Sequence, residues 1–162
     1  MNTQPKVGHL ERRRIEGRVL VPFIEACREK FGEDATRELV ASFIKKASVA
    51  DGAVTAKRFG GDLAGLRRVA EEVWGGPGGG IDIELLATTE ERLEFNVTRC
   101  GYAQLYKDWG LSELGFQLQC SRDFPMLEGF GGDIELTRTQ TIMHGAACCD
   151  FRYRRKGSPS RT

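Results

Sequence analysis

The chain has 162 residues, 40% of them hydrophobic, which is enough for one domain with a buried core. Lysine and arginine total 24 against 23 aspartate and glutamate, so the formal net charge is only +1. That balance argues against a nucleic-acid binder that depends on an overall positive field. The basic clusters Arg12–Arg14 and Arg152–Lys156 are short, and we predict that both lie on the solvated surface.

We see no secretory signal pattern and no apolar run approaching the roughly 20 residues that cross a membrane. We therefore expect a cytoplasmic protein whose thiols stay reduced. It has five cysteines: Cys27, Cys100, Cys120, Cys148 and Cys149. We expect them to be packing residues, metal ligands or nucleophiles rather than a disulfide framework.

The first half of the chain has helical periodicity. We expect a flexible arm over residues 1–10, then a helix from Arg12 to Phe31–Gly32 that places Cys27 in the core. A second helix follows Asp34, with turns expected at Asp51–Gly52 and Gly60–Gly61. The apolar stripes of these two helices are predicted at Ile15, Val19, Pro22, Phe23, Ala26 and Cys27, and at Ala35, Leu39, Val40, Phe43, Ile44 and Ala47. A third helix is predicted over 62–74.

A run of glycines, Gly75–Gly80 with Pro77, separates this half from the next. It lacks the Gly-Lys-Ser/Thr ending of a phosphate-binding loop, so we interpret it as a flexible connector. We thus predict a single domain over 11–156, made of a helical half (11–75), the connector (76–80) and a mixed half (81–156). Residues 157–162 are predicted to be a tail.

In the mixed half the periodicity changes to alternation. Ile81–Leu85 and Leu93–Val97 predict a β-hairpin that leads to Cys100, and further strands are predicted at 134–142 and 149–153. Helices are predicted at 102–109, 113–120 and, as a turn, 123–128. The fold class that follows is α+β, with an N-terminal helical half packed on an antiparallel sheet that other helices cover.

Three cysteines lie at element boundaries in the mixed half, where side chains from different elements can converge. Cys100, Cys120 and Cys149 each have polar neighbours, which favours a thiol nucleophile assisted by His144. Asp123 and Asp150 are candidates to orient a base or to activate water, and Arg138 and Arg152 to bind a substrate carboxylate. Two alternatives stay open: a zinc site, for which the cysteine spacing is poor, and inert buried cysteines beside structural ion pairs.

Two blocks of motifs are similar to one family. The first is Asn96-x-Thr98-x-Cys100-x-Tyr102-Ala103-x-x-Tyr106, then Glu113-Leu114-Gly115 and Cys120-x-x-Asp123. The second is Gly129-Phe130, then Leu136-Thr137-Arg138-Thr139-Gln140-Thr141-Ile142-Met143-x-Gly145 and Cys149-Asp150-Phe151-Arg152. With the opening Glu11-Arg12-Arg13-Arg14-Ile15-Glu16, the chain resembles the L-2-amino-thiazoline-4-carboxylic acid hydrolase family over about residues 10–155.

The resemblance implies a bacterial hydrolase that opens a C–N bond in a small cyclic amidine, as when a 2-aminothiazoline carboxylate becomes S-carbamoyl-cysteine. It implies a small-molecule substrate. From the charge balance and the lack of a long apolar run we expect no nucleic-acid or membrane partner, and homo-oligomer formation stays open. We expect no cofactor, with zinc or iron as the minor alternative. His144 and Cys148 fall outside the family pattern, which shifts the mechanism toward Cys with Asp123 or Asp150.

The predicted site therefore has two groups of residues. The predicted catalytic residues are Cys100, Cys120, Asp123, Cys149 and Asp150. The predicted substrate-binding residues are Asn96, Thr98, Tyr106, Glu113, Arg138, Thr141, His144 and Arg152. The alternative from another class is a non-catalytic small-molecule or metal-binding module, similar to sensor domains, that uses the same cysteines.

Overall fold

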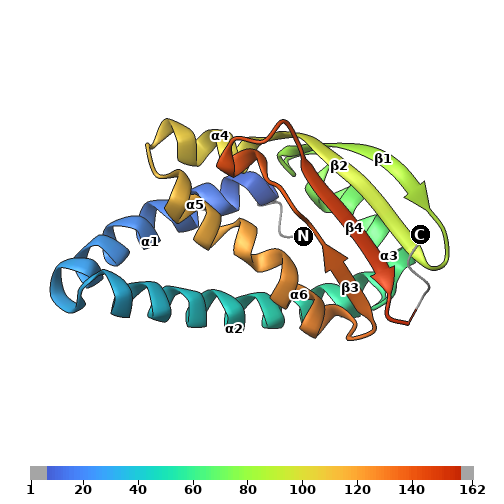
Figure 1. The fold of residues 1–162 in the computed structure, drawn as a ribbon, viewed down its shortest axis with the longest axis horizontal. Coiled ribbons are helices and arrows are strands. Elements are labelled where there is room, and N and C mark those ends of the chain that lie inside the picture. The colour runs from blue at the N-terminus through green and yellow to red at the C-terminus, as the bar shows by residue number, and fades with distance from the viewer. Residues whose placement is uncertain (1–6, 158–162) are drawn as a thin grey trace, which may run out of the picture.

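Two long helices, α1 (His9–Phe31) and α2 (Glu33–Phe59), open the fold in the computed structural model, which describes residues 7–157. Gly32 alone joins them, with a φ of 84° that glycine adopts without strain, and they run from there toward the sheet (Figure 1). Helix α1 begins before the predicted start at Arg12. Residues 1–6 of the predicted arm and 158–162 of the predicted tail lie outside the described residues.

The predicted turn at Asp51–Gly52 is wrong, because α2 continues through both residues. Gly52 instead allows α6 (Asp123–Phe130) to cross α2 closely, since a Cβ at this position would lie 2.1 Å from the Met126 carbonyl oxygen. From the other side, a Cβ on Gly129 would lie 2.0 Å from the Val49 carbonyl oxygen. The two glycines thus bring the backbones of α2 and α6 into contact.

The apolar stripes of α1 and α2 are only partly those predicted. Cys27 is buried as expected, together with Ile24, Val40 and Ile44. Most residues of the predicted stripes are instead exposed: Ile15, Val19, Pro22, Phe23, Ala26, Ala35, Leu39 and Phe43. The buried side of the two helices includes small or polar residues, among them Gly17, Thr36 and Ser48. At Gly17 a Cβ would lie 3.0 Å from the Trp109 ring and from the Tyr106 hydroxyl, so these side chains leave no room for a larger residue.

Helix α3 (Leu63–Val69) begins at Asp62, whose carboxylate accepts a hydrogen bond from the Gly65 amide at 2.7 Å. A π-helical turn, η1 (Ala70–Trp74), continues it. The Gly-rich connector then makes hydrogen bonds to two distant elements: the Leu10 amide donates to the Gly78 carbonyl, and the Gly101 amide donates to the Gly80 carbonyl. The connector thus links the start of α1 to the start of α4 (Gly101–Asp108).

The sheet contains β1 (Ile81–Thr88), β2 (Arg92–Cys100), β3 (Ile134–Thr137) and β4 (Cys149–Arg155), in the order β1-β2-β4-β3. All neighbouring strands are antiparallel, as predicted. The predicted strand over 134–142 is too long, and β3 ends at Thr137. The Asp150 carboxylate accepts hydrogen bonds from the amides of Thr139 and Gln140, which holds this segment in a loop instead of a ladder.

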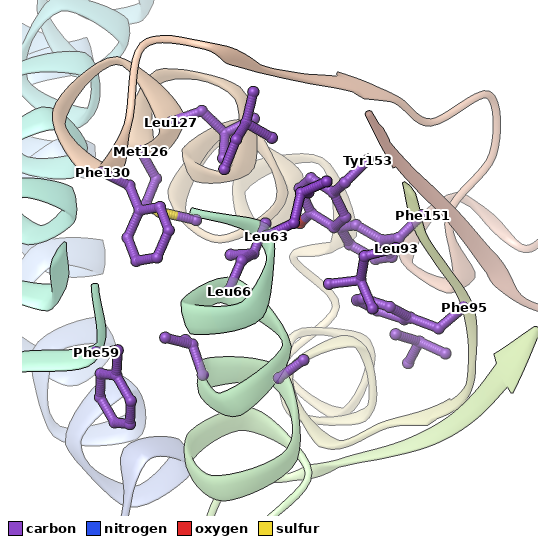
Figure 2. Packing of buried hydrophobic residues seen from close by; sticks show 14 of the residues in the cluster. Phe59, Leu63, Leu66, Leu93, Phe95, Met126, Leu127, Phe130, Phe151 and Tyr153 are labelled. Atoms are coloured by element: carbon purple, nitrogen blue, oxygen red, sulfur yellow. The ribbon is translucent and has the colours of Figure 1, made fainter. Parts of the chain in front are cut away.

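The two faces of the sheet differ sharply. Leu93, Phe95, Phe151 and Tyr153 point to the buried face and pack against Leu63 and Leu66 of α3, with Met126, Leu127 and Phe130 of α6 alongside (Figure 2). The alternating residues of β2 and β4 form the opposite face, which is partly solvated, and we call it the outer face. Strand alternation therefore decides which side chains can reach the protein interior.

The remaining helical segments are α5 (Ser112–Leu118), η2 (Cys120–Arg122) and η3 (Ile142–His144). A second core joins them to α1, α2 and α4: Ile24, Val40, Ile44, Ala103, Tyr106, Leu114, Leu118 and Met143. The architecture is α+β, as the sequence predicts. None of the helices within residues 7–157 combines the length and apolar character that crossing a membrane requires.

Candidate functional site

A cavity of about 370 Å³ lies where α1, α2, η1, the buried sheet face and the start of α6 meet. Its apolar wall is formed by Phe59, Val69, Val73, Trp74, Ile81, Phe95, Val97, Met126 and Phe151. The polar lining divides into two groups of residues. One is on the side of the thiols, and the other is on the side of α1 and α2.

The thiol group consists of Cys100, Cys120 and Cys149, which all line the cavity. Cys100 ends β2 and caps α4, its sulfur accepting a hydrogen bond from the Ala103 amide at 3.4 Å. The Cys149 sulfur accepts one from the Ile142 amide at 3.2 Å. A negative charge on Cys100 or Cys149 would raise the pKa of Cys120. The structure thus brings together three thiols that are up to 49 residues apart in the chain.

Burial keeps these thiols protonated. It raises the pKa of Cys149 to about 11, and it raises the pKa of Cys100 and, most strongly, of Cys120. The nearby Asp123 carboxylate raises all three pKa values further, whereas Arg138 lowers those of Cys120 and Cys149. A thiolate is therefore disfavoured at neutral pH at each of the three positions.

Asp123 and Arg138 form an ion pair beside the thiols. The Arg138 side chain is only 4% exposed, donates to the Cys120 carbonyl and packs against the rings of Phe116, Phe124 and Phe151. Burial raises the pKa of Asp123 to about 6, although the charge of Arg138 and its hydrogen bond act in the opposite direction. Asp123 is thus a carboxyl group that titrates close to neutral pH, as general acids and bases do.

The second group of polar lining residues is rich in arginine. Arg12 and Arg13 of α1 and Arg122 of η2 line it together with Asp51 of α2. The Asp51 carboxylate is shared, lying 3.2 Å from a nitrogen of Arg13 and 3.6 Å from one of Arg122. The two guanidinium groups are well buried, with side chains 8% and 12% exposed. We call Arg12, Arg13, Asp51 and Arg122 the arginine end of the cavity.

His9 and Tyr102 lie next to the arginine end. The Tyr102 hydroxyl donates to the Gly79 carbonyl, so it must accept the hydrogen bond that joins it to His9 Nδ1 at 2.7 Å. This assigns the proton of His9 to Nδ1 and leaves Nε2 as an acceptor. Burial, with the charges of Arg13 and Arg12, lowers the pKa of His9 to about 4, so the ring is neutral at pH 7.

Five of the residues predicted from the sequence are brought together at the cavity: Cys100, Cys120, Asp123, Arg138 and Cys149. Four others project from the outer face or its edge: Asn96, Thr98, Asp150 and Arg152. Arg152 donates to the carbonyls of Phe95 and Phe151 and to the Asn96 side chain. The sheet lies between these four residues and the cavity, because their neighbours in β2 and β4 face the interior.

The last four predicted residues do not line the cavity either. Tyr106 is fully buried in the second core, and Thr141 caps η3 by accepting from the His144 amide. His144 is exposed, stacks on Phe116 and lies 3.4 Å from the exposed Glu113. Tyr106 and Thr141 thus contribute to packing and helix capping, and His144 and Glu113 lie on the surface.

Sequence reasoning missed the arginine end and His9. The prediction that Arg12–Arg14 lies on the solvated surface is wrong for Arg13, which is buried between Glu16 and Asp51. Asp51 was assigned to a turn, and Arg122 appeared only as a neighbour of Cys120. One signal in the sequence could have indicated Arg12 and Arg13. They belong to the Glu11–Glu16 motif, which is part of the family resemblance and had been given no role in the site.

The structure gives no ligand set for the metal alternative. Within residues 7–157, no three His, Cys, Asp or Glu side chains form a group that could hold a metal ion. The thiols converge on the cavity without such a group.

Comparison with known proteins adds one finding. The family model described as L-2-amino-thiazoline-4-carboxylic acid hydrolase matches residues 12–153. No curated protein matches the chain. The matched segment contains every cavity-lining residue named above except His9.

Proposed function

Because the chain belongs to the L-2-amino-thiazoline-4-carboxylic acid hydrolase family, we propose that its cavity binds a small heterocyclic carboxylate with a cyclic amidine and hydrolyses a C–N bond of the ring. The observation that carries this proposal is Asp123, a cavity-lining carboxyl group whose pKa is raised to about 6. The cavity volume and its mainly apolar wall suit a ligand of this size.

Asp123 acts as the general base in this proposal. Its ion pair with Arg138 keeps a population of carboxylate at neutral pH, and burial makes that carboxylate more basic than an ordinary aspartate. A water molecule beside Asp123 would give up a proton to it as the oxygen attacks the amidine carbon between the ring sulfur and the ring nitrogen.

The atoms then balance in two steps. Attack forms a C–O bond and breaks the C=N π bond, whose electron pair moves onto the ring nitrogen, and it leaves a tetrahedral adduct with one proton on Asp123. Collapse of the adduct forms the carbonyl and breaks the bond from the former amidine carbon to the ring nitrogen. That nitrogen receives the proton from Asp123 and the proton of the adduct's hydroxyl, and leaves as an amine. The product of an aminothiazoline carboxylate would be a ring-opened S-carbamoyl compound, an S-alkyl thiocarbamate with a free amine.

The thiols have a supporting part in this scheme. Their raised pKa values leave them as neutral S–H groups at pH 7, so water activated by a carboxylate is favoured over attack by a thiolate. Neutral thiols also form an apolar surface around Asp123, which contributes to its raised pKa. We therefore propose Cys100, Cys120 and Cys149 as residues that line the pocket. Substitution of each cysteine, described below, tests the alternative that one of them is the nucleophile.

The experiment measures turnover of 2-aminothiazoline-4-carboxylate by the appearance of the ring-opened S-carbamoyl product. We expect Asp123→Asn to lower kcat by about 10²–10⁴-fold, the usual contribution of a positioned base. The matched control is Asp108→Asn, since Asp108 is an exposed aspartate on α4 that does not line the cavity. Ligand binding without turnover by the wild-type protein would contradict the proposal and favour the non-catalytic module.

The three thiols are tested by Cys→Ala variants in the same assay. We expect Cys100→Ala, Cys120→Ala and Cys149→Ala each to retain turnover within about tenfold. Loss as large as that of Asp123→Asn in any one of them would contradict activation by Asp123 alone and identify a nucleophilic thiol.

A further inference from the structure

The arginine end of the cavity carries more positive than negative charge. Arg12, Arg13 and Arg122 meet two carboxylates there, Asp51 and Glu16. Glu16 pairs with both Arg12 and Arg13, and Asp51 is divided between Arg13 and Arg122. One positive charge therefore has no carboxylate partner of its own among these groups.

Arg122 is the least compensated member. Its side chain is 12% exposed, its Nε donates to the Leu118 carbonyl, and its contact with Asp51 at 3.6 Å is longer than a hydrogen bond. Burial and the neighbouring charge of Arg13 lower the pKa of Arg122 to about 10 in spite of Asp51. A buried guanidinium with incomplete pairing is costly, and an anion that enters the cavity would lower that cost.

We propose that Arg122 and Arg13 form a subsite for the carboxylate of an anionic substrate, in competition with Asp51. This inference rests on the proposed function for the identity of the substrate, and it goes further by naming the groups that select for a carboxylate. The planar guanidinium of Arg122 is suited to two parallel hydrogen bonds with a carboxylate.

The proposed subsite lies next to Asp123, the proposed general base. Arg122 immediately precedes Asp123 in the chain, both line the cavity, and the charge of Arg122 lowers the pKa of Asp123. A short ring that bears a carboxylate can thus contact Arg122 while its amidine carbon lies toward Asp123. The sequence-based candidates for this role do not fit, because Arg138 is occupied by Asp123 and Arg152 projects from the outer face.

Calorimetric titration tests the subsite without hydrolysis. Thiazole-4-carboxylate and thiazole-4-carboxamide are suitable probes, because their aromatic ring lacks the amidine and they differ only in charge and hydrogen bonding. We expect the wild-type protein to bind the carboxylate at least tenfold more tightly than the carboxamide. Arg122→Gln should remove most of that difference while changing carboxamide binding less than threefold.

Two further variants separate binding from folding. Arg14→Gln is the matched control, since Arg14 is a neighbouring arginine on α1 that pairs with Glu11 and does not line the cavity. It should bind both probes as the wild type does. Asp51→Asn should tighten carboxylate binding by threefold or more, because it removes the competing anion, and a merely unfolded variant would not gain affinity.

Equal affinity of the wild type for the two probes, or an equal loss of both in a folded Arg122→Gln, would overturn the subsite. The two proposals fail separately. Carboxylate-selective binding without turnover of the aminothiazoline supports the subsite and refutes the hydrolase. Turnover of the aminothiazoline without any preference for the carboxylate probe supports the hydrolase and refutes the subsite.

Discussion

The pH dependence of turnover is the sharpest test of Asp123. With a pKa of about 6, this carboxyl group is about nine-tenths ionised at pH 7 and about one-tenth ionised at pH 5. A general base must be ionised, so kcat/KM should rise about tenfold from pH 5 to pH 7 and level off above it. The assay is initial rates at low substrate concentration across this range.

The midpoint can be assigned to Asp123 by removing its partner. Arg138 lowers the pKa of Asp123 by its charge and its hydrogen bond, so Arg138→Gln should move the midpoint upward from about 6. His9, with a pKa lowered to about 4, and Cys149, with a pKa raised to about 11, titrate outside this window. A midpoint that stays at its wild-type value in a folded Arg138→Gln would refute the assignment.

The Asp123 carboxyl group should also make the free energy of unfolding depend on pH in the absence of substrate. Because burial raises the pKa of Asp123, the folded state holds its proton more tightly than the unfolded state. The free energy of unfolding that Asp123 contributes therefore falls as pH rises from about 4 to about 6, by about 3 kcal/mol from the difference between about 6 and 3.8. Urea unfolding should show this fall in the wild type relative to Asp123→Asn. Parallel pH profiles of the two proteins would contradict it.

Three further predictions concern stability, each measured by urea denaturation. Gly52→Ala should cost about 1–3 kcal/mol, because its Cβ would lie 2.1 Å from the Met126 carbonyl oxygen, whereas Gly132→Ala has open space and should be nearly neutral. Tyr153→Phe should stabilise by about 1 kcal/mol, because the Tyr153 hydroxyl is buried with no hydrogen-bond partner among residues 7–157; destabilisation would indicate a hidden partner. Cys100→Ala should cost about 1 kcal/mol through loss of the cap on α4, and Cys100→Ser, whose hydroxyl can accept from the Ala103 amide, should recover most of it. Equal stabilities of the Ala and Ser variants would contradict that role.

Much of the site's thiol side could be predicted because its residues lie at element boundaries in recognisable motifs. Cys100 follows a strand with clear alternation, and Asp123 follows Cys120 at a fixed spacing. Asn96, Asp150 and Arg152 were grouped with them because they are close in sequence. In a strand, however, residues at an odd spacing point to opposite faces, so Asp150 and Arg152 project away from the face that Cys149 shares with the cavity. Asn96 is four residues from Cys100, but the pairing of β2 with β1 shifts register between Val97 and Arg99, which breaks the simple alternation between the two.

The arginine end was not predictable for a different reason. Its members come from α1, α2 and η2, and Arg13 pairs with Asp51 across 38 residues of chain. Isolated arginines on helices are usually solvated, and nothing local distinguishes the buried Arg13 from the half-exposed Arg14 beside it. Only the packing of α1 against α2 buries Arg13 beside Asp51 and leaves Arg14 at the surface.

By itself the sequence determined the periodicity of each segment, the α+β class, the core position of Cys27 and the family, because these depend on local spacing and on motif order. The tertiary structure decided which polar groups share one cavity and which lie behind the sheet. It also decided the protonation of those groups, because a pKa depends on burial and on charges contributed by distant segments. Asp123 is visible in the sequence as one aspartate among several, and its burial beside Arg138 is what distinguishes it.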